Sequence, residues 1–415
     1  MNEEQYAAFH AFTERKNIFL TGSAGTGKSF TLKEIIKWAR DQNLKMGITA
    51  TTGSAAFLIG GRTLHSFLGI GLGKKSPRDM AMILKRKNPQ LYAKLSTLDV
   101  LIIEEVSMLD KETFEKISEY LSIIRGNSAP FGGLQLFLLG DFCQLPPLDR
   151  TYCFQSTLWG LLDPVIIDLK RLMRQSGDEE FQKILHKLRY GRCSSGTLAK
   201  LKERLTSLQP HTTKLPNGIK PTILFATNDN VDKINAIKFK QLVDKGALCR
   251  TYTCAYSDER AKTWGTSCKV PESIQLCKGA QVVCSWNVDQ DNGVINGTRG
   301  VIAALDAVSV TITVMDGRQV TIPMITVKDE DCARNTITFM PLKLAWALSI
   351  HKSQGMTLDA LVLDLGNSIF EYGQAYVALS RARNLASVRI LAVEKESFKT
   401  HPDVLAFYRN ITAQT

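Results

Sequence analysis

The sequence predicts an α/β protein built from two domains, each with a parallel β-sheet. Short apolar runs of strand length alternate with amphipathic, helix-like stretches in the first half of the chain, and the alternation returns later, from about residue 222. Strands that alternate with helices favour right-handed crossovers, which place parallel strands side by side under helices on both faces. The length of 415 residues also exceeds what one hydrophobic core usually organises.

Each predicted strand is a short apolar run that ends near polar residues or glycine. Ligands bind at the carboxyl ends of the strands in sheets of this kind, so the residues after each run are site candidates. The predicted strands are Asn17–Leu20, Lys45–Ala50, Val100–Ile103, Leu134–Leu139 and Val165–Leu169 in the first domain, and Thr222–Ala226, Leu361–Asp364 and Val388–Val393 in the second.

Between about residues 301 and 341 the pattern changes to one typical of antiparallel strands. Apolar and polar residues alternate there, and Asp316-Gly317 supplies a turn-forming pair. This combination indicates a hairpin. We therefore expect a small β-barrel-like insert in the second domain.

The composition is that of an ordinary globular protein, with 44% hydrophobic and 22% charged residues and a formal net charge of +12. The basic surplus indicates a polyanionic partner such as nucleic acid, with generic basicity as the alternative. No stretch is long and apolar enough to span a bilayer. The first ten residues carry acids and lack a cleavable leader or transit peptide, so we expect an intracellular protein of the cytoplasm, nucleoid or nucleus.

The nine cysteines are scattered singly and include no C-x-x-C pair. Zinc sites are typically built from such close pairs, so no zinc site is predicted. An unpaired set in a leaderless chain is typical of reduced thiols. Cysteine chemistry is therefore not expected.

The strongest functional signal is GSAGTGKS at residues 22–29, which matches the P-loop pattern G-x-x-x-x-G-K-[ST]. It follows an apolar strand and precedes a helical stretch, which is the context the motif requires. Glycines leave backbone N–H groups free to wrap phosphate oxygens, and the helix N-terminus adds positive potential. The motif predicts ATP and Mg²⁺ binding, with Lys28 at the β- and γ-phosphates and Ser29 on the metal. The nucleotide-binding candidates here are Gly22, Ser23, Ala24, Gly25, Thr26, Gly27, Lys28 and Ser29.

Two adjacent carboxylates, Glu104 and Glu105, follow the Val100–Ile103 run. Consecutive residues at a strand tip point to different faces, so the two side chains can do different work. One can hold Mg²⁺ through water, while the other orients or deprotonates the attacking water. A solvated acidic turn is the alternative, which the upstream P-loop disfavours.

A further predicted strand leads into GDFCQLPP. The amide of Gln144 is placed to sense the γ-phosphate, with Asp141 and the stiff Pro146-Pro147 fixing the loop. A structural turn without a sensing role is the alternative.

With these segments in place, the chain resembles superfamily 1B helicases of the RecD/PIF-like kind, which include the petite-integration-frequency helicases and the phage Dda enzyme. Matching segments run in the family's order from Glu4 to about Arg383, and SIHKSQG and YVALSRA are highly specific to this group. The other matches are EEQYAAF, ITATTGSAA, TLHSF, RLMRQ, KGAQVV and NGTRG.

The resemblance implies two RecA-like P-loop NTPase domains, at residues 1–170 and at 171–300 with 342–415. It also implies a pin subdomain at about 70–98 and an SH3-like insert at about 301–341. The implied activity is that of a monomeric ATP-dependent DNA helicase moving 5′ to 3′ on single-stranded DNA, with forked or tailed duplexes as substrates. An RNA-directed motor and a P-loop ATPase without a nucleic-acid track are the alternatives.

The resemblance also assigns roles at the nucleotide. Gln5 would contact the adenine base and Gly355 would lie near the nucleotide. Glu104 takes the magnesium role and Glu105 the catalytic-base role, although the family usually has Asp-Glu here. Because Glu is one methylene longer, the water-bridged metal geometry must adjust. The implied catalytic set is Lys28, Glu105, Gln144 and two arginine fingers, Arg174 and Arg381, the second lying across the cleft between the domains.

Strand contacts are implied on both domains, made by groups that donate to phosphate oxygens without reading sequence. A local cap or turn explains each of them nearly as well, and Phe67 is expected in the core rather than as a stacking platform. The basic residues between about 74 and 94 would together supply non-specific attraction to phosphate. A solvated helix is the alternative for this segment. The candidates are Thr52, His65, Ser66, His351, Lys352 and Ser353, with Lys85, Arg86 and Lys87 from a segment that also holds Lys74, Lys75, Arg78 and Lys94 against a single acid, Asp79.

Overall fold

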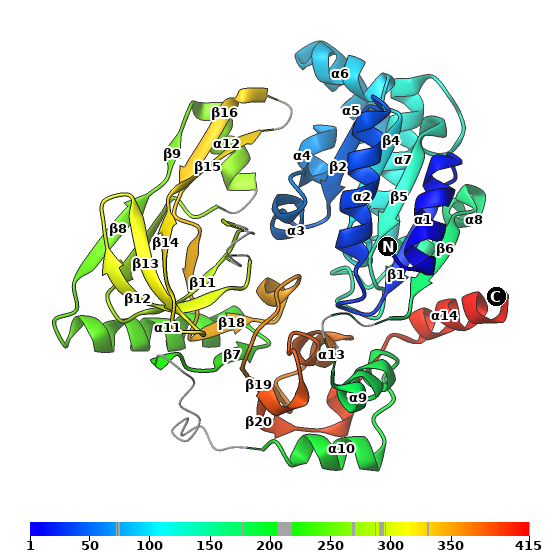
Figure 1. The fold of residues 1–415 in the computed structure, drawn as a ribbon. Helices are drawn as coiled ribbons and strands as arrows, with labels where there is room; N and C mark the ends of the chain where they lie inside the picture. Colours follow the sequence, from blue (N-terminus) through cyan, green and yellow to red (C-terminus); the bar gives the residue numbers. More distant parts are fainter. Residues whose placement is uncertain are drawn as a thin grey trace. The chain divides into compact units, whose positions relative to one another are not determined.

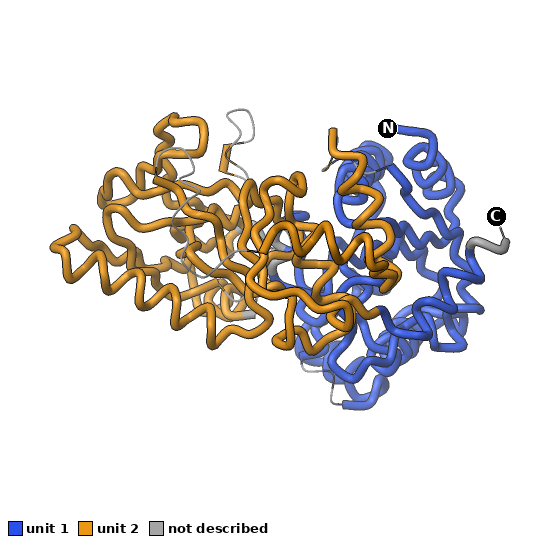
Figure 2. The backbone as a smooth tube through the Cα atoms, turned by 90° about the horizontal axis from the view of Figure 1, so that it is seen from below, with its two compact units in different colours: residues 1–173, 400–415 blue, residues 174–399 orange. Residues whose placement is uncertain are grey.

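The structure is a computed structural model that describes residues 1–71, 73, 75–171, 173, 175, 177–205, 218–267, 270–286, 288–289, 294, 296–329 and 332–414. It divides into two compact units (Figure 2). Unit 1 comprises Met1–Met173 and Thr400–Thr415, and unit 2 comprises Arg174–Lys399. Within the described ranges, none of the helices combines the length and apolarity needed to cross a membrane.

Unit 1 is built on a six-stranded sheet in the order β3-β2-β4-β5-β1-β6, in which every neighbouring pair is parallel (Figure 1). The five strands predicted for the first domain are confirmed. The short edge strand β3 was not predicted, because two residues carry no periodic pattern. The strands are β1 (Ile18–Gly22), β2 (Met46–Ala50), β3 (Arg62–Thr63), β4 (Val100–Glu104), β5 (Gln135–Leu139) and β6 (Val165–Leu169).

Helices cover both faces of this sheet, as the alternation of side chains along β1 requires. Ile18 and Leu20 enter a core shared with α1 and α2. Phe19 points to the opposite face, where its ring centroid lies 5.3 Å from that of Trp159 in α8. The helices are α1 (Glu3–Thr13), α2 (Lys28–Asp41), α3 (Gly53–Leu58), α4 (Leu64–Leu68), α5 (Pro77–Lys87), α6 (Pro89–Ser96), α7 (Lys111–Arg125), α8 (Thr157–Leu162) and α14 (Pro402–Gln414).

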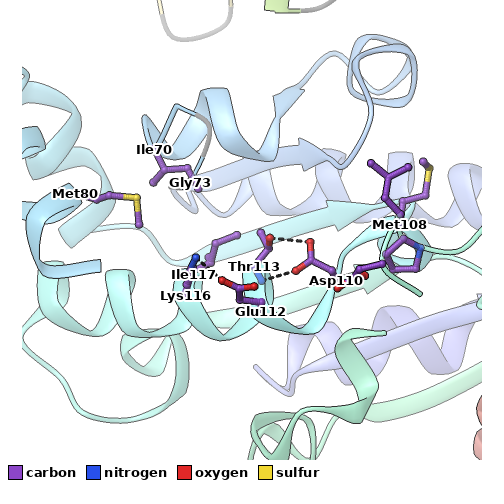
Figure 3. A pocket seen from close by; sticks show the side chains of 12 residues that line it. Ile70, Gly73, Met80, Met108, Asp110, Glu112, Thr113, Lys116 and Ile117 are labelled. Carbon is purple, nitrogen blue, oxygen red and sulfur yellow. Dashed lines mark hydrogen bonds and ion pairs between the residues drawn. The ribbon is translucent and has the colours of Figure 1, made fainter. Parts of the chain in front are cut away.

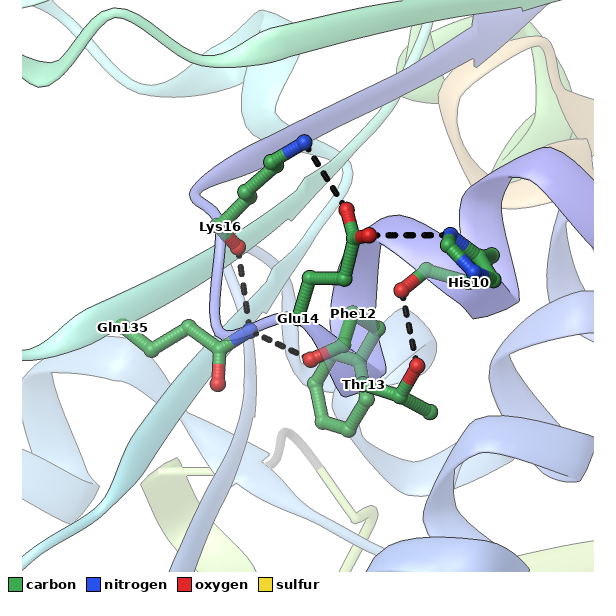
Figure 4. A network of polar contacts seen from close by, with 6 residues as sticks. All are labelled: His10, Phe12, Thr13, Glu14, Lys16 and Gln135. Carbon is green, nitrogen blue, oxygen red and sulfur yellow. Dashed lines mark hydrogen bonds and ion pairs between the residues drawn. The ribbon is translucent and has the colours of Figure 1, made fainter.

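Helix α1 is held at both ends. At its start, Asn2 and Gln5 form a capping box in which each side chain accepts from the other's backbone N–H at 2.9 Å. Past its end, Gln135 of β5 donates from Nε2 to the carbonyls of Phe12 (3.0 Å) and Lys16 (2.9 Å), as Figure 4 shows. These bonds fix Gln5 relative to the sheet.

Unit 2 contains a four-stranded parallel sheet in the order β18-β7-β19-β20. The three strands predicted for the second domain are confirmed. Strand β18 was missed because it lies in the apolar run LKLAWALSI, which periodicity alone does not assign. The strands are β7 (Thr222–Phe225), β18 (Ala347–Ser349), β19 (Leu361–Leu365) and β20 (Val388–Val393), and the helices are α9 (Glu179–Arg189), α10 (Ser195–Lys202), α11 (Asn228–Val243), α12 (Glu259–Ser267) and α13 (Gln374–Leu379).

The antiparallel part of unit 2 is larger than the predicted insert, since it already begins at β8. The hairpin predicted at Asp316-Gly317 is confirmed: β13 pairs with β14, and Gly317 has a φ of 90°. The earlier strands were missed because α12 interrupts their alternation. The strands are β8 (Cys249–Thr253), β9 (Ala255–Tyr256), β10 (Ser273–Cys277), β11 (Gln281–Cys284), β12 (Arg299–Leu305), β13 (Ser309–Val314), β14 (Gln319–Pro323), β15 (Ile325–Asp329), β16 (Cys332–Phe339) and β17 (Leu342–Leu344).

The C-terminal helix α14 belongs to unit 1, whereas the resemblance implied that residues 342–415 belong to the second domain. Its Phe407 ring stacks on Phe154 at 4.4 Å between centroids and meets Phe142 edge-on at 5.4 Å. Aromatic pairs of this geometry add to the stabilisation from buried area. The helix is therefore an integral part of the unit 1 core.

Candidate nucleotide site and strand-contact residues

The P-loop, residues 22–29, connects the end of β1 to the first turn of α2. Its glycines have left-handed or related backbone conformations, with φ of 141° at Gly22, 90° at Gly25 and 96° at Gly27. A Cβ at Gly22 would lie 2.7 Å from the carbonyl oxygen of Leu169, and one at Gly27 would lie 2.7 Å from Nε2 of Gln5. Glycine is thus required at Gly22 by both backbone conformation and space, and at Gly25 and Gly27 by backbone conformation. The second contact also places the Gln5 amide beside the P-loop.

Lys28 begins α2 and its ammonium lies against the P-loop itself. Nζ donates to the carbonyl oxygens of Gly22 (2.7 Å) and Ser23 (3.1 Å). The hydroxyl of Thr26 donates to the same Ser23 carbonyl at 2.9 Å. The loop, the ammonium and the N-terminus of a 14-residue helix together create positive potential where a phosphate group would lie.

Glu104, the last residue of β4, is only 8% exposed, and its Oε2 has no hydrogen-bond partner among the described residues. Burial, together with the charge of Glu105, raises the pKa of Glu104 to about 8, while the charge of Lys28 and a hydrogen bond with Ser29 act against this increase. A buried, unsatisfied carboxylate oxygen beside a serine hydroxyl fits Mg²⁺, which takes few protein ligands and keeps waters and phosphate oxygens. The described residues contain no cluster of three or more His, Cys, Asp or Glu side chains arranged for a metal.

Glu105 lies outside the strand and adopts a left-handed backbone, with φ of 55° and ψ of 42°. The two carboxylates are therefore separated by a backbone turn. The prediction that strand pleating separates them is wrong. Thr51 stabilises the turn, because its N–H donates to the Glu104 carbonyl (3.1 Å) and its hydroxyl donates to the Glu105 carbonyl (2.8 Å). A left-handed residue with a side chain costs about 1–2 kcal/mol, and such strain is often found at functional sites.

Gln144 is buried in a tight turn after β5. Its backbone N–H donates to the carbonyl of Asp141 at 2.8 Å, and Oδ1 of Asp141 accepts from the N–H of Cys143 at 3.1 Å. The prediction that Asp141 fixes this loop is confirmed. The sensing role of Gln144 stays a prediction.

In unit 2, Arg381 follows α13 and is 2% exposed. Its guanidinium donates to the carbonyl of Val377 (3.0 Å) and to Oγ of Ser380 (2.8 Å). Nε2 of Gln175 donates to the carbonyls on both sides of Arg381, those of Ser380 (3.3 Å) and Ala382 (3.0 Å). Gln175 thus holds the backbone that carries Arg381. Gln175 was not singled out from the sequence, although it directly follows the predicted arginine finger Arg174. Arg174 lies outside the described residues.

The strand-contact candidates of unit 1 lie on α3, α4 and α5. Thr52 caps α3, since its hydroxyl accepts from the N–H of Ala55 at 3.2 Å. His65 and Ser66 are half-buried in α4, and desolvation lowers the pKa of His65 despite the opposing charge of Asp110. Phe67 is buried, as predicted. The exposed Lys85, Arg86 and Lys87 occupy the last turn of α5, where the helix dipole favours cations.

The candidates of unit 2 lie in the 3-10 turn His351–Ser353. His351 and Lys352 are exposed, whereas Ser353 is buried and its hydroxyl donates to the carbonyl of Ile350 at 2.8 Å. For Ser353 these contacts support the turn role. Gly355 follows with a φ of 75° and is exposed.

A cavity of about 380 Å³ lies in unit 1 beside the loop after β4 (Figure 3). Apolar side chains from Met80, Met108 and Ile117 contribute to its lining. Four of its polar side chains are paired with one another: Asp110 accepts from the N–H and hydroxyl of Thr113, both at 2.7 Å, and Lys116 pairs with Glu112 at 2.6 Å. No P-loop residue lines this cavity, so it is distinct from the nucleotide site.

Comparisons with known proteins point to one helicase family. The PIF1-like helicase family model matches residues 1–198, and the model of the DNA helicase Pif1 2B domain matches residues 261–305. The ATP-dependent DNA helicase PIF1 of Xenopus laevis is 37% identical over 99% of this chain. The chain spans 64% of the length of this relative and of its human counterpart.

Several solved structures cover nearly the whole chain, and two of them illustrate the match. The crystal structure of Pif1 helicase from Candida albicans is 35% identical, covers 99% of both chains and has a TM-score of 0.80. The structure of Pif1 helicase from Bacteroides in complex with ADP-AlF3 and single-stranded DNA is 28% identical, covers 99% of this chain and 97% of that one, and has a TM-score of 0.70. The two parallel sheets are the expected pair of RecA-like domains, and the chain belongs to the PIF1-like helicase family.

Proposed function

We propose that this chain is an ATP-dependent DNA helicase that moves 5′ to 3′ along single-stranded DNA and unwinds duplex DNA ahead of it. The observation that carries the proposal is the P-loop with Lys28 and Ser29 beside the buried, raised-pKa carboxylate of Glu104. The activity named for the relatives supports it. The polarity rests on the family resemblance.

In this proposal the backbone of residues 22–29 wraps the phosphates, Gln5 contacts the base, and Lys28 lies at the β- and γ-phosphates. Ser29 and Glu104 would hold Mg²⁺. When bound, Mg²⁺ offsets the charge that develops on the phosphate oxygens.

Glu105 orients and deprotonates the attacking water, and its left-handed turn separates it from the metal-side carboxylate. Gln144 senses the γ-phosphate from the loop that Asp141 holds by hydrogen bonds. Arg174 and Arg381 offset charge in the transition state, which makes the free energy of closure of the two units depend on ATP. Gly355 lies near the nucleotide.

Thr52, His65, Ser66 and residues 85–87 of unit 1, together with residues 351–353 of unit 2, contact the strand. Contacts to the sugar–phosphate backbone carry no sequence information, so translocation can proceed along any sequence. Closure and opening in each ATP cycle then move the strand by alternating grip. The motor works as a monomer on tailed or forked duplexes.

Unwinding of matched duplexes that carry a 5′ tail, a 3′ tail or no tail tests the proposal. With ATP and Mg²⁺, only the 5′-tailed duplex should be unwound, and Lys28→Ala should abolish unwinding without unfolding the protein. Unwinding from the 3′ tail refutes the polarity. Stimulation of ATPase by RNA and not by DNA favours an RNA-directed motor. ATPase that no nucleic acid stimulates favours an enzyme without a track.

A further inference from the structure

The hydroxyl of Tyr408, on the C-terminal helix α14, connects two segments of the nucleotide site. It lies 2.6 Å from Oγ1 of Thr21, the residue that precedes the P-loop in β1. It accepts from the backbone N–H of Phe142 at 3.2 Å and donates to Oδ1 of Asp141 at 3.3 Å. One hydroxyl thus joins the strand before the P-loop to the loop after β5.

A single tyrosine hydroxyl can form all three of these hydrogen bonds. A phenol has one hydrogen to donate and oxygen lone pairs that accept. When it donates to Asp141, it can accept from both Phe142 and the hydroxyl of Thr21. Tyr408 is 5% exposed and its three partners are also buried, so each bond forms where an unpaired polar group is costly.

The contacts extend from Tyr408 to Gln144. Asp141 accepts from Tyr408 through its side chain, and its own carbonyl accepts from the N–H of Gln144 at 2.8 Å. The strand that leads into the loop is also bonded to β1, because the N–H of Gly140 donates to the carbonyl of Leu20 at 3.2 Å. Loss of the Tyr408 hydroxyl would remove the hydrogen bonds that join Asp141 and Phe142 of this turn to α14.

Helix α14 is also the direct continuation of unit 2. The chain leaves unit 2 at Lys399, whose carbonyl accepts from the N–H of Gly373 at 2.9 Å and whose ammonium donates to the carbonyl of Phe370 at 2.9 Å. It enters unit 1 at Thr400, and α14 begins at Pro402. The segment fixed to the Gln144 loop is therefore joined by a very short connection to a segment fixed on unit 2.

We propose that Tyr408 is a positioning residue of the nucleotide site: its hydroxyl fixes the Asp141–Gln144 loop against the strand that enters the P-loop. The link to turnover rests on the proposed function, in which Gln144 senses the γ-phosphate. The link to the loop rests on the hydrogen bonds alone. Tyr408 touches no phosphate in this proposal and acts through Asp141 and Phe142.

The test compares full-length Tyr408→Phe, which removes one oxygen and keeps the ring, with a matched control. Tyr252→Phe serves as the control, because Tyr252 is 3% exposed and its hydroxyl lies 2.8 Å from the carbonyl of Asp306 and 3.0 Å from that of Ser309, within unit 2. Thr21→Val removes the hydroxyl on the other side of the Tyr408 contact, and Thr21→Ser retains it.

Hydrogen–deuterium exchange of the ligand-free protein is the first readout. Amides of residues 141–144 should exchange about tenfold faster in Tyr408→Phe and Thr21→Val, as expected for loss of one buried hydrogen bond. They should be unchanged in Tyr252→Phe and close to the original in Thr21→Ser. Unchanged exchange of these amides in Tyr408→Phe overturns the proposal.

DNA-stimulated ATPase is the second readout. Tyr408→Phe should lower kcat about tenfold and change KM for ATP less than about twofold, and adding Thr21→Val should bring little further loss. An equal loss of kcat in Tyr252→Phe overturns the positioning role, because any lost tyrosine hydroxyl would then suffice. If the unsubstituted chain has no DNA-stimulated ATPase, the proposed function fails, and the exchange experiment alone decides whether Tyr408 positions the loop.

Discussion

Glu104→Gln should remove a pH-dependent destabilisation of the ligand-free protein. The structure raises the pKa of Glu104 from 4.5 to about 8, chiefly by burial. A group whose pKa is higher in the folded than in the unfolded protein stabilises the fold fully below pH 4.5, and this stabilisation is lost as the pH rises to about 8. At 1.36 kcal/mol per pKa unit, the upper limit of the loss is about 5 kcal/mol.

Denaturant titrations at intervals from pH 4.5 to 9, without Mg²⁺ or nucleotide, measure this effect. The glutamine side chain resembles a protonated glutamate, so the two proteins should unfold with similar free energies near pH 4.5. Above pH 8, Glu104→Gln should be more stable by several kcal/mol. Titrating groups that do not interact with Glu104 behave alike in both proteins and cancel in the difference; Glu105 and Lys28, which do interact with it, do not cancel fully.

Glu119→Gln provides the control, since Glu119 is exposed on α7 and substitutions at such sites usually change stability by less than about 0.5 kcal/mol. The reasoning is refuted if the difference between Glu104→Gln and the original protein stays constant from pH 4.5 to 9. It is also refuted if Glu119→Gln shows the same trend.

Three further predictions concern activity and binding. Glu105→Gln should leave ATP binding intact and abolish hydrolysis, whereas Glu104→Asp should keep turnover; a normal steady-state ATPase rate in Glu105→Gln contradicts the catalytic-base role. Gln175→Met keeps the side-chain volume but cannot donate to the carbonyls around Arg381. We therefore expect kcat to fall about tenfold, with a smaller change in KM for ATP. Equal changes in kcat and KM would indicate misfolding instead. Replacing residues 85–87 with alanine should weaken the salt dependence of binding to single-stranded DNA. The slope of log affinity against log salt concentration should become shallower by about 2, at roughly 0.7 per phosphate contact. An unchanged slope excludes this patch from the interface.

Local chemistry made the nucleotide site predictable from sequence. The P-loop glycines have the positive φ values that the motif requires, and Lys28 and Ser29 follow at the start of a helix. Glu104 was placed correctly at a strand end. The reason given for its separation from Glu105 was wrong, because a left-handed turn at Glu105 has no signature that distinguishes it from continued strand.

Contacts distant in sequence were not predictable in the same way. Tyr408 bonds to Thr21 across 387 positions, and no periodicity links the two. Gln175 reaches carbonyls more than 200 positions away, although it stood beside a recognised arginine. The early antiparallel strands of unit 2 were missed because each is short and their partners lie beyond intervening elements.

The placement of α14 affects how the protein can be divided for experiment. A fragment that stops at Met173 would leave the rings of Phe19, Phe142 and Trp159 without the Phe407 ring that packs on them. Such newly bared aromatic surface promotes self-association. An N-terminal half prepared for separate study should therefore carry residues 400–415, joined through a flexible tether, to remain soluble and folded.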